Sequence, residues 1–344
     1  MNLLIRADAS TQIGTGHIMR CLALAQAWKD VGGNAIFVMA TEMLSLETRL
    51  KSEGMEVIHL SVNPGSMEDA KKTVSLAHQF GVNWVVVDGY HFGATYQEII
   101  KNVGLKLLFI DDYGHAEYYY ADVVLNQDIY AHDNLYVQRE PYTQLLLGIN
   151  YALIRREFYQ YQKEQRTHPV IAKKLLVTLG GSDLNNVTLK VIHALKLLDL
   201  SKFEVSVLVD GNNTHYEKLQ LASQDLQFPI YFHRNIQNMP DIMAWSDIAI
   251  SAGGSTIWEL AFMGLPSLIL IMADNQASNA KKLGEMRLIY NLGEGKDIAP
   301  IEIANALNKL TLATRERAQM ASLCQKLVDG QGSIRVLNQI MHSI

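Results

Sequence analysis

The sequence contains little cysteine and no excess of positive charge, and each absence excludes a class of protein. Its 344 residues include two cysteines, Cys21 and Cys324. These are too few for a disulfide framework or a CxxC zinc site, so we expect a protein of the reducing cytoplasm. Lys and Arg number 30 against 35 Asp and Glu, a net charge of −5, whereas nucleic-acid-binding proteins usually carry a basic excess. We therefore expect no nucleic-acid partner.

Long hydrophobic runs are also missing. The apolar segment Pro266–Ala273 has the length of one strand, whereas a membrane span needs about 20 apolar residues. The N-terminal MNLLIRADAS carries Asp8 and lacks the basic start and long apolar stretch of a signal peptide. We expect no stable membrane association. No heptad repeat or obvious adhesive strand indicates an oligomer, so we expect a monomer.

Composition and periodicity predict an α/β protein of two domains. Hydrophobic residues make up 49%, and a chain of this length forms about two domains at roughly 150 residues each. Short runs rich in Val, Ile, Leu and Phe alternate with helical patterns, of which His17–Val31 is the clearest. Such runs are typical of parallel strands buried on both faces. In the first half they are Asn2–Ile5, Ala35–Met39, Glu56–Leu60, Trp84–Val87, Lys106–Ile110, Val123–Leu125 and Gln144–Leu147.

The sequence between Gly148 and Ala172 breaks this pattern, because Tyr151–Gln165 is aromatic and charged and Pro169 discourages helix. A second series of apolar runs follows it. It comprises Lys174–Leu179, Glu204–Val209, Pro229–Phe232, Ile248–Ile250 and Ser267–Ile271. We therefore predict two Rossmann-like, doubly wound domains, over residues 1–155 and 156–344, with about 40 helical residues at the end. Ligands of such sheets bind beyond the carboxyl ends of the strands, so the cleft between the domains is the expected site.

The first strand is followed by Gly14 and Gly16, and then by His17 at the expected start of a helix. Met19 replaces the third glycine of a GxGxxG fingerprint, so a nicotinamide site is not favoured. The helix dipole disfavours an imidazolium at this place, which leaves a neutral ring able to act as a general base. By position alone, a helix-capping or packed histidine is equally well supported.

Acidic and aromatic residues follow two further strands of the first half, in Asp88-Gly89-Tyr90-His91 and Asp111-Asp112-Tyr113-Gly114-His115. Carboxylates such as Asp88, and Asp8 after the first strand, would orient a base or hold sugar hydroxyls. The alternative is that each aspartate caps a turn. No short pair of ligands stands out among the 11 histidines, so we expect no metal.

The second half carries two glycine turns suited to an anion. Gly180, Gly181 and Ser182 follow a strand, without the lysine of a Walker A loop. The stronger segment is SAGGST, which includes Gly254, Ser255 and Thr256 and leads into a helix ending near Met263. Its N–H groups suit a diphosphate, and Glu259 one turn later suits a ribose. The amides of Asn275 and Gln276 end the next strand. The alternative is an ordinary βαβ unit with a surface glutamate.

Several of these motifs are similar to known families. SAGGSTIWELAFMGLPS followed by ADNQASNA resembles the nucleotide-binding half of the MurG-type, lipid-II-forming GT-B glycosyltransferases. With RADAS, GTGHIMRCLALA, DGYH, DDYGH, LGINYALIRREF and LGGSD added, the chain resembles the PseG family over nearly its whole length. These are the UDP-2,4-diacetamido-2,4,6-trideoxy-β-L-altropyranose hydrolases of pseudaminic acid biosynthesis. Beyond about residue 290 no motif matches.

The PseG resemblance implies a GT-B fold and hydrolysis of that UDP-sugar without metal or cofactor. It implies water attack at the anomeric carbon with C–O cleavage and inversion, and His17 as the base. Ser255 and Thr256 would contact the diphosphate and Glu259 the ribose. Further sugar or diphosphate contacts would come from Tyr90, Asn275, Gln276 and Asn279.

Three other functions remain open: a glycosyltransferase of the same fold, a non-catalytic nucleotide-sugar-binding protein, and a UDP-N-acetylhexosamine 2-epimerase. The apolar segment Met39–Leu50 has Arg49 as its single positive charge. Lipid-II-type transferases, by resemblance, dock on the membrane with an apolar and basic patch. This segment therefore favours water over a lipid acceptor.

Overall fold

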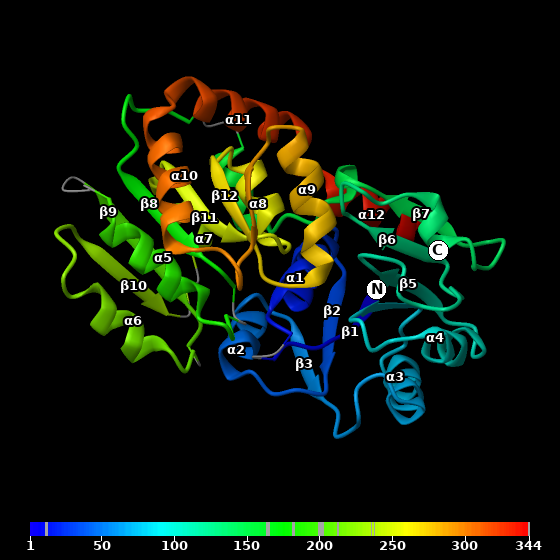
Figure 1. Cartoon of the computed structure of the whole chain (residues 1–344). Coiled ribbons are helices and arrows are strands. Elements are labelled where there is room, and N and C mark those ends of the chain that lie inside the picture. Colours follow the sequence, from blue (N-terminus) through cyan, green and yellow to red (C-terminus); the bar gives the residue numbers. More distant parts are fainter. Residues whose placement is uncertain are drawn as a thin grey trace. The chain divides into compact units, whose positions relative to one another are not determined.

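A computed structural model describes residues 1–10, 13–162, 166–180, 183–198, 203–211, 213–234, 236 and 238–342. The chain folds into two compact units (Figure 1). Unit 1 comprises Met1–Ser10, Thr15–Arg156 and Gly330–Ile344, and unit 2 comprises Thr11–Gly14 and Glu157–Asp329. Within the described ranges, no helix is long and apolar enough to cross a bilayer.

Unit 1 is built on a seven-stranded parallel sheet in the order β3-β2-β1-β4-β5-β6-β7. Its strands are β1 (Asn2–Ala7), β2 (Asn34–Met39), β3 (Glu56–His59), β4 (Trp84–Asp88), β5 (Lys106–Ile110), β6 (Val123–Asn126) and β7 (Gln144–Leu147). The order reverses between β1 and β4, which pair directly with each other. The carboxyl ends of these two strands therefore form the switch point where a ligand is expected.

Helices cover both faces of this sheet. One face packs α1 (Gly16–Asp30), α2 (Leu44–Ser52) and α12 (Gly332–Met341), and the other packs α3 (Met67–Gln79) and α4 (Ala94–Lys101). Successive strand residues point to opposite faces, so Leu3 and Ile5 join the first core while Leu4 joins the second. Short 3₁₀ helices lie at Asp133–Tyr136, Ile149–Tyr151 and Arg156–Tyr161.

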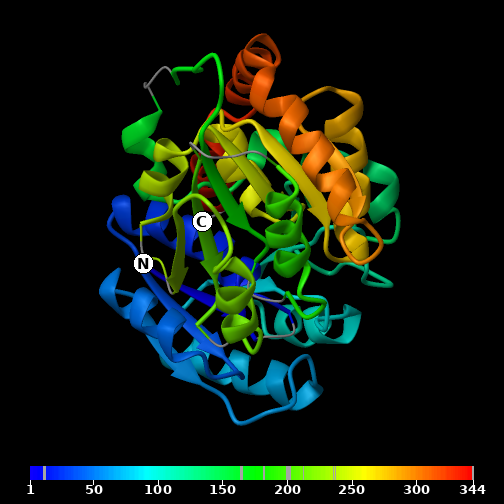
Figure 2. The same ribbon diagram turned by 60° about the vertical axis from the view of Figure 1, so that its left-hand side comes forward.

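Unit 2 repeats the architecture with a six-stranded parallel sheet in the order β10-β9-β8-β11-β12-β13 (Figure 2). Its strands are β8 (Lys174–Thr178), β9 (Glu204–Val209), β10 (Ile230–Arg234), β11 (Ile248–Ala252), β12 (Ser267–Ile271) and β13 (Tyr290–Glu294). Its helices are α5 (Val187–Lys196), α6 (Tyr216–Ser223), α7 (Met239–Trp245), α8 (Thr256–Phe262), α9 (Ala277–Glu285), α10 (Pro300–Leu312) and α11 (Thr314–Leu327), with a 3₁₀ turn at Asp274–Gln276. Here the switch point lies between β8 and β11.

Every predicted strand is present with its ends within two residues of the prediction, and β13 was missed. The sequence of β13, YNLGE, contains polar residues and a glycine. It lies at the edge of the sheet, where strand pairing does not require a continuous apolar run. The two predicted doubly wound domains are confirmed as fold class.

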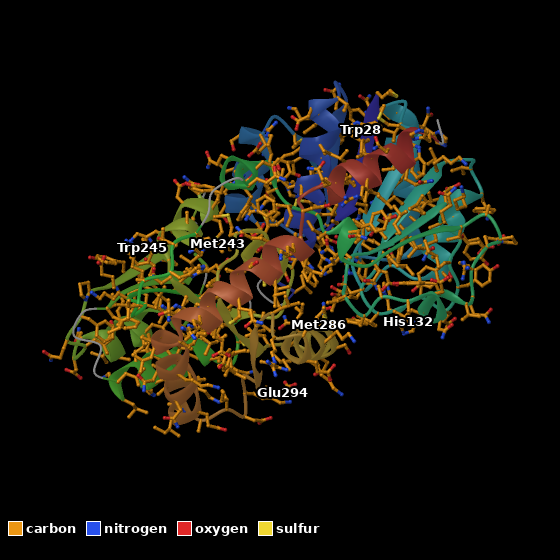
Figure 3. The ribbon with its side chains drawn as sticks, turned by 90° about the horizontal axis from the view of Figure 1, so that it is seen from above. Trp28, His132, Met243, Trp245, Met286 and Glu294 are labelled. Atoms are coloured by element: carbon orange, nitrogen blue, oxygen red, sulfur yellow. The ribbon has the colours of Figure 1, made fainter. Side chains whose placement is uncertain are left out.

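The final helix departs from the predicted domain limits, which placed residues 156–344 together. Helix α12 packs against α1 in unit 1, and Figure 3 shows the two side by side near Trp28. Val336, Leu337 and Ile340 of α12 are buried in the same core cluster as Trp28. These side chains form one apolar stripe at helical spacing. A stripe shows that a helix is buried on one side, but it does not say against which sheet.

Candidate active site

The switch point of unit 1 brings His17 and Asp88 into contact. Helix α1 begins at Gly16, so His17 is its second residue, and Asp88 is the last residue of β4. His17 Nδ1 lies 2.7 Å from Asp88 Oδ1. The histidine is 7% exposed and the aspartate is fully buried.

This contact fixes the tautomer of the His17 ring. An ionised carboxylate accepts hydrogen bonds and donates none, so Nδ1 must carry the proton that bridges to Asp88. In a neutral ring, Nε2 then holds the lone pair. Within the described part of the chain, Nε2 has no hydrogen-bond partner. The ring therefore has the form of a general base whose orientation is set by a buried acid.

Arg20 clamps the same aspartate from one helical turn further along α1. Its Nε and Nη2 donate to Oδ2 and Oδ1 of Asp88, each at 2.7 Å. Its Nη1 donates to Asp112 Oδ1 at 2.5 Å. Burial would raise the pKa of Asp88, but the charge of Arg20 and the hydrogen bonds from Arg20 and His17 outweigh it and hold that pKa well below its usual range. Asp88 is thus a fixed negative charge behind the His17 ring.

Aromatic side chains line the neighbourhood of His17. The Tyr90 hydroxyl donates to Asp112 Oδ2, and the Tyr90 ring meets the His17 ring edge-on with 4.8 Å between centroids. Tyr113 packs on Tyr90 at 5.2 Å and is 41% exposed. Burial and the charge of Asp112 raise the pKa of Tyr90 well above its usual value, so its hydroxyl is a neutral donor.

Asp88 was expected to contact substrate, and the geometry corrects this assignment. Both of its oxygens are engaged by His17 and Arg20, and Cys21 Sγ donates to Oδ2 at 3.4 Å. A fully buried, fully engaged carboxylate has no room for a sugar hydroxyl. Its contact with His17 fits the other role expected of a strand-end acid, which is to orient a base.

Two other strand-end acids follow the structural alternative. Asp111 Oδ1 accepts from the backbone N–H groups of Tyr113 and Gly114, at 2.8 and 2.9 Å, which is turn capping. Asp8 pairs with Arg6 at 2.8 Å and accepts from the Ala40 N–H at 2.7 Å. Neither acid contacts His17 in the described structure.

Arg20 and Asp112 were missed as site residues. The available signal for Arg20 was its spacing, because residues i and i+3 of a helix share a face. An arginine on the otherwise apolar helix face of His17 needs a buried acid, and Arg20 is only 6% exposed. For Asp112 the signal was its place directly after β5. Gly14, also expected at this site, has a φ of 77°, and Gly16 is the first residue of α1.

The second predicted group lies after β8 and β11 of unit 2. Gly180 has a φ of 82° and is exposed, while Gly181 and Ser182 lie outside the described residues. Ser255 stands at the N-cap of α8 without a side-chain capping bond, and Thr256 is the first helical residue. Both are half-buried, and Glu259 on the same helix is 8% exposed.

Gln276 ties this group together. Its Oε1 accepts from the backbone N–H of Gly253 at 3.1 Å and of Met272 at 2.9 Å. The loop after β11 is thereby joined to the end of β12. Gly254 lies close by, since a Cβ there would sit 3.6 Å from Gln276 Nε2. Oε1 of Gln276 thus holds the loop in place, and the predicted contact of its amide group with a sugar or diphosphate stays a prediction. Asn275 is half-buried and Asn279, on α9, is 4% exposed.

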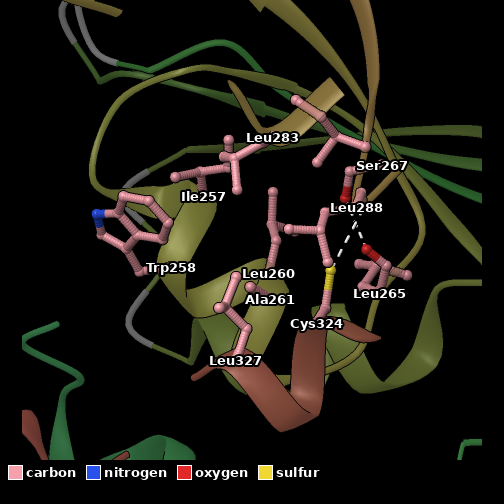
Figure 4. Close-up of a pocket in the computed structure, with 11 residues that line it drawn as sticks. Ile257, Trp258, Leu260, Ala261, Leu265, Ser267, Leu283, Leu288, Cys324 and Leu327 are labelled. Atoms are coloured by element: carbon pink, nitrogen blue, oxygen red, sulfur yellow. Dashed lines mark hydrogen bonds between the residues drawn. The ribbon is translucent and has the colours of Figure 1, made fainter. Parts of the chain in front are cut away.

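The inner side of α8 packs on an apolar cavity that offers a ligand nothing polar (Figure 4). Its lining includes Leu260, Leu283 and Leu327. The polar atoms at its wall are used internally, because Ser267 Oγ donates to the Leu265 carbonyl at 2.7 Å and Cys324 Sγ to the Leu288 carbonyl at 3.3 Å. The apolar side chains around this cavity hold α8 against its neighbours, and the cavity does not fit a nucleotide.

Comparison with known proteins agrees with this fold. Residues 175–331 match the family model of the glycosyltransferase family 28 C-terminal domain. MJ1062, an uncharacterized protein of Methanocaldococcus jannaschii, is 27% identical over 80% of this chain, which spans 57% of that protein's length. The UDP-2,4-diacetamido-2,4,6-trideoxy-β-L-altropyranose hydrolase of Campylobacter jejuni is 28% identical over 83% of this chain and 97% of its own.

Among solved structures, MurG of Acinetobacter baumannii superimposes with a TM-score of 0.67 at 16% identity, covering 99% of this chain and 100% of its own. At that identity the likeness concerns the fold. The chain thus has the GT-B fold of two doubly wound units, is similar over most of its length to a PseG hydrolase, and matches glycosyltransferase family 28 in residues 175–331.

Proposed function

We propose that this protein is an enzyme that hydrolyses UDP-2,4-diacetamido-2,4,6-trideoxy-β-L-altropyranose to UDP and the free sugar, with His17 as general base. The observation that carries the proposal is the hydrogen bond between His17 and Asp88 at the switch point of unit 1. It gives the ring the tautomer that a base needs. The similarity to the Campylobacter jejuni hydrolase supports the choice of substrate.

In the proposed reaction, His17 Nε2 removes a proton from water as the water oxygen attacks the anomeric carbon. The new C–O bond forms while the bond from that carbon to the diphosphate oxygen breaks. The electron pair leaves with UDP, and the configuration at carbon inverts. The ring becomes an imidazolium, which the Asp88 carboxylate stabilises. UDP leaves as a stable anion, so its departure requires no strong acid.

We propose that unit 2 holds the UDP. The family match over residues 175–331 supports this assignment. Glu259 would accept the ribose hydroxyls, while Gly254, Ser255 and Thr256 would donate to the diphosphate. Polar contacts from Asn275 and Asn279 would complete this side, and Tyr90 would contact the sugar in unit 1. No metal or cofactor is part of the proposed reaction.

A glycosyltransferase is the second candidate, because the same family match and the MurG-like fold are those of transferases. In that reaction His17 would deprotonate an acceptor hydroxyl in place of water. The choice of acceptor is therefore the experimental question.

A time course by phosphorus and proton NMR tests the proposal. The purified protein is mixed with the altropyranose nucleotide and EDTA, with no acceptor added. We expect UDP and the free sugar to appear together. An unchanged spectrum, with UDP binding retained, would contradict hydrolysis of this nucleotide sugar and favour a different UDP-sugar, a transferase awaiting its acceptor or a binding protein. An epimerised sugar or a glycal would indicate an epimerase.

A further inference from the structure

Arg20 lies between two buried carboxylates, those of Asp88 and Asp112. The proposed reaction as described so far gives this arginine no role. It makes two hydrogen bonds to Asp88 and one to Asp112. Asp112 in turn accepts from the Tyr90 hydroxyl. One guanidinium therefore connects the acid that orients His17 with the acid that holds Tyr90.

The charges in this cluster oppose one another at His17. A buried carboxylate 2.7 Å from Nδ1 stabilises the protonated ring. A ring protonated before water arrives cannot act as a base. The Arg20 Nη2 atom lies 3.2 Å from the same Nδ1, and its positive charge disfavours the imidazolium. The negative charge of Asp112 partly offsets the effect of the Arg20 charge on the ring.

We propose that Arg20 is a positioning residue whose positive charge, held beside His17 Nδ1 by Asp88 and partly offset by Asp112, disfavours protonation of His17 before it removes a proton from water. This inference rests on the proposed role of His17 as base. The guanidinium fork is suited to the task because it can bind two carboxylates at fixed geometry. A lysine carries the same charge but lacks the fork.

The charged and titratable groups facing His17 come from three elements. They are Arg20 and Cys21 of α1, Asp88 and Tyr90 at the end of β4, and Asp112 after β5. Burial and the charge of Asp88 raise the pKa of Cys21 well above its usual value, so its thiol adds no charge. Burial and Asp112 do the same for the Tyr90 hydroxyl. The balance between the neutral and the protonated His17 ring therefore depends on the charges of Asp88, Arg20 and Asp112.

Two substitutions move this balance in opposite directions. Arg20→Met removes the positive charge, so the imidazolium gains stability and the acidic limb of the kcat/KM profile moves up by about one pH unit. Asp112→Asn removes a negative charge, so Arg20 acts more fully on the ring and the limb moves down. Arg20→Lys restores part of the displacement caused by the methionine variant.

The readouts are the pH profile of UDP release and the ¹⁵N NMR titration of the His17 ring. Arg156→Met is the matched control, because Arg156 pairs with Asp30 and Glu53 at a half-exposed site. We expect this control to leave the titration unchanged. A merely structural Arg20 would lower kcat at every pH without moving the limb, and shifts of the same sign in both variants would also overturn the proposal.

The NMR titration needs no turnover, so the two proposals fail separately. If the wild-type protein releases no UDP, the proposed hydrolysis fails, while the ring titration still tests Arg20. If Arg20→Met does not fold, Asp112→Asn alone decides the matter. A His17 titration that is unchanged or moves upward in Asp112→Asn would overturn the role of Arg20.

Discussion

His17 Nδ1 and Asp88 Oδ1 lie 2.7 Å apart, although 71 positions separate the two residues in the sequence. The contact is made by the topology of the sheet, since β1 and β4 are neighbours and their carboxyl ends meet at the switch point. His17 follows β1 at the start of α1, and Asp88 ends β4. The fold thereby places a potential base directly in front of a buried acid.

His17→Phe tests the base. Phenylalanine fills the space of the imidazole but cannot take a proton, so we expect kcat for UDP release to fall by about 10²-fold or more. Binding of UDP should be unchanged. His132→Phe is the control, since His132, labelled in Figure 3, is exposed and is not among the described contacts of His17. Rapid UDP release by the His17 variant would contradict the assignment.

Asp88→Asn tests the orienting acid. The amide is nearly isosteric but neutral, so it neither fixes the Nδ1–H tautomer nor stabilises the imidazolium. We expect kcat to fall by about 10²-fold or more while KM changes little. ¹⁵N NMR of the His17 ring should show a mixture of tautomers. A variant with wild-type kcat would show that Asp88 serves the fold and not the base.

The sequence predicted the strands well because both faces of a parallel sheet are buried, which makes each strand a short apolar run. It placed Asp88 at the correct edge for the same reason. It could not show which way the carboxylate points, because side-chain direction reverses at each strand residue. The partners of Arg20, and the sheet against which α12 packs, depend on contacts between residues far apart in the sequence. Local periodicity does not reveal such contacts.

Glu259→Ala tests the proposed ribose contact. Losing a hydrogen bond to a charged group should weaken UDP binding by about tenfold or more in calorimetry. Comparison with 2′-deoxy-UDP makes the test specific, because the wild type should prefer UDP while the variant should not discriminate. Glu285→Ala, at an exposed position of α9, is the control. An unchanged preference in Glu259→Ala would contradict the role.

Asp8→Asn tests the acid stability of unit 1. Burial raises the pKa of Asp8, but the hydrogen bond with His91, the Arg6 charge and the Ala40 N–H outweigh it and lower that pKa to about 2. The unfolded value is about 3.9. A depressed folded pKa contributes stability above the unfolded value, which is lost as pH falls from about 4 through 2.

For this buried group the contribution amounts to about 2 kcal/mol. Urea unfolding followed by circular dichroism should therefore show a shallower loss of stability between about pH 4.5 and pH 2.5 in the variant. Asp133→Asn, at an exposed position, should keep the wild-type slope. Equal slopes in wild type and Asp8→Asn would show that the Arg6–Asp8 pair does not drive acid unfolding.

Ile340→Ala tests the assignment of α12 to unit 1. Ile340 is fully buried in the core cluster that contains Trp28, and such a truncation costs about 2–5 kcal/mol. Ile334 lies on the same helix but is 41% exposed, so Ile334→Ala should change stability by about 0.5 kcal/mol or less.

Hydrogen exchange read by mass spectrometry should speed up in β1 and α1 of Ile340→Ala. Exchange in β8 and β11 should stay unchanged, because unit 2 has a separate core. Faster exchange confined to unit 2 would contradict this assignment and support the predicted second domain of residues 156–344.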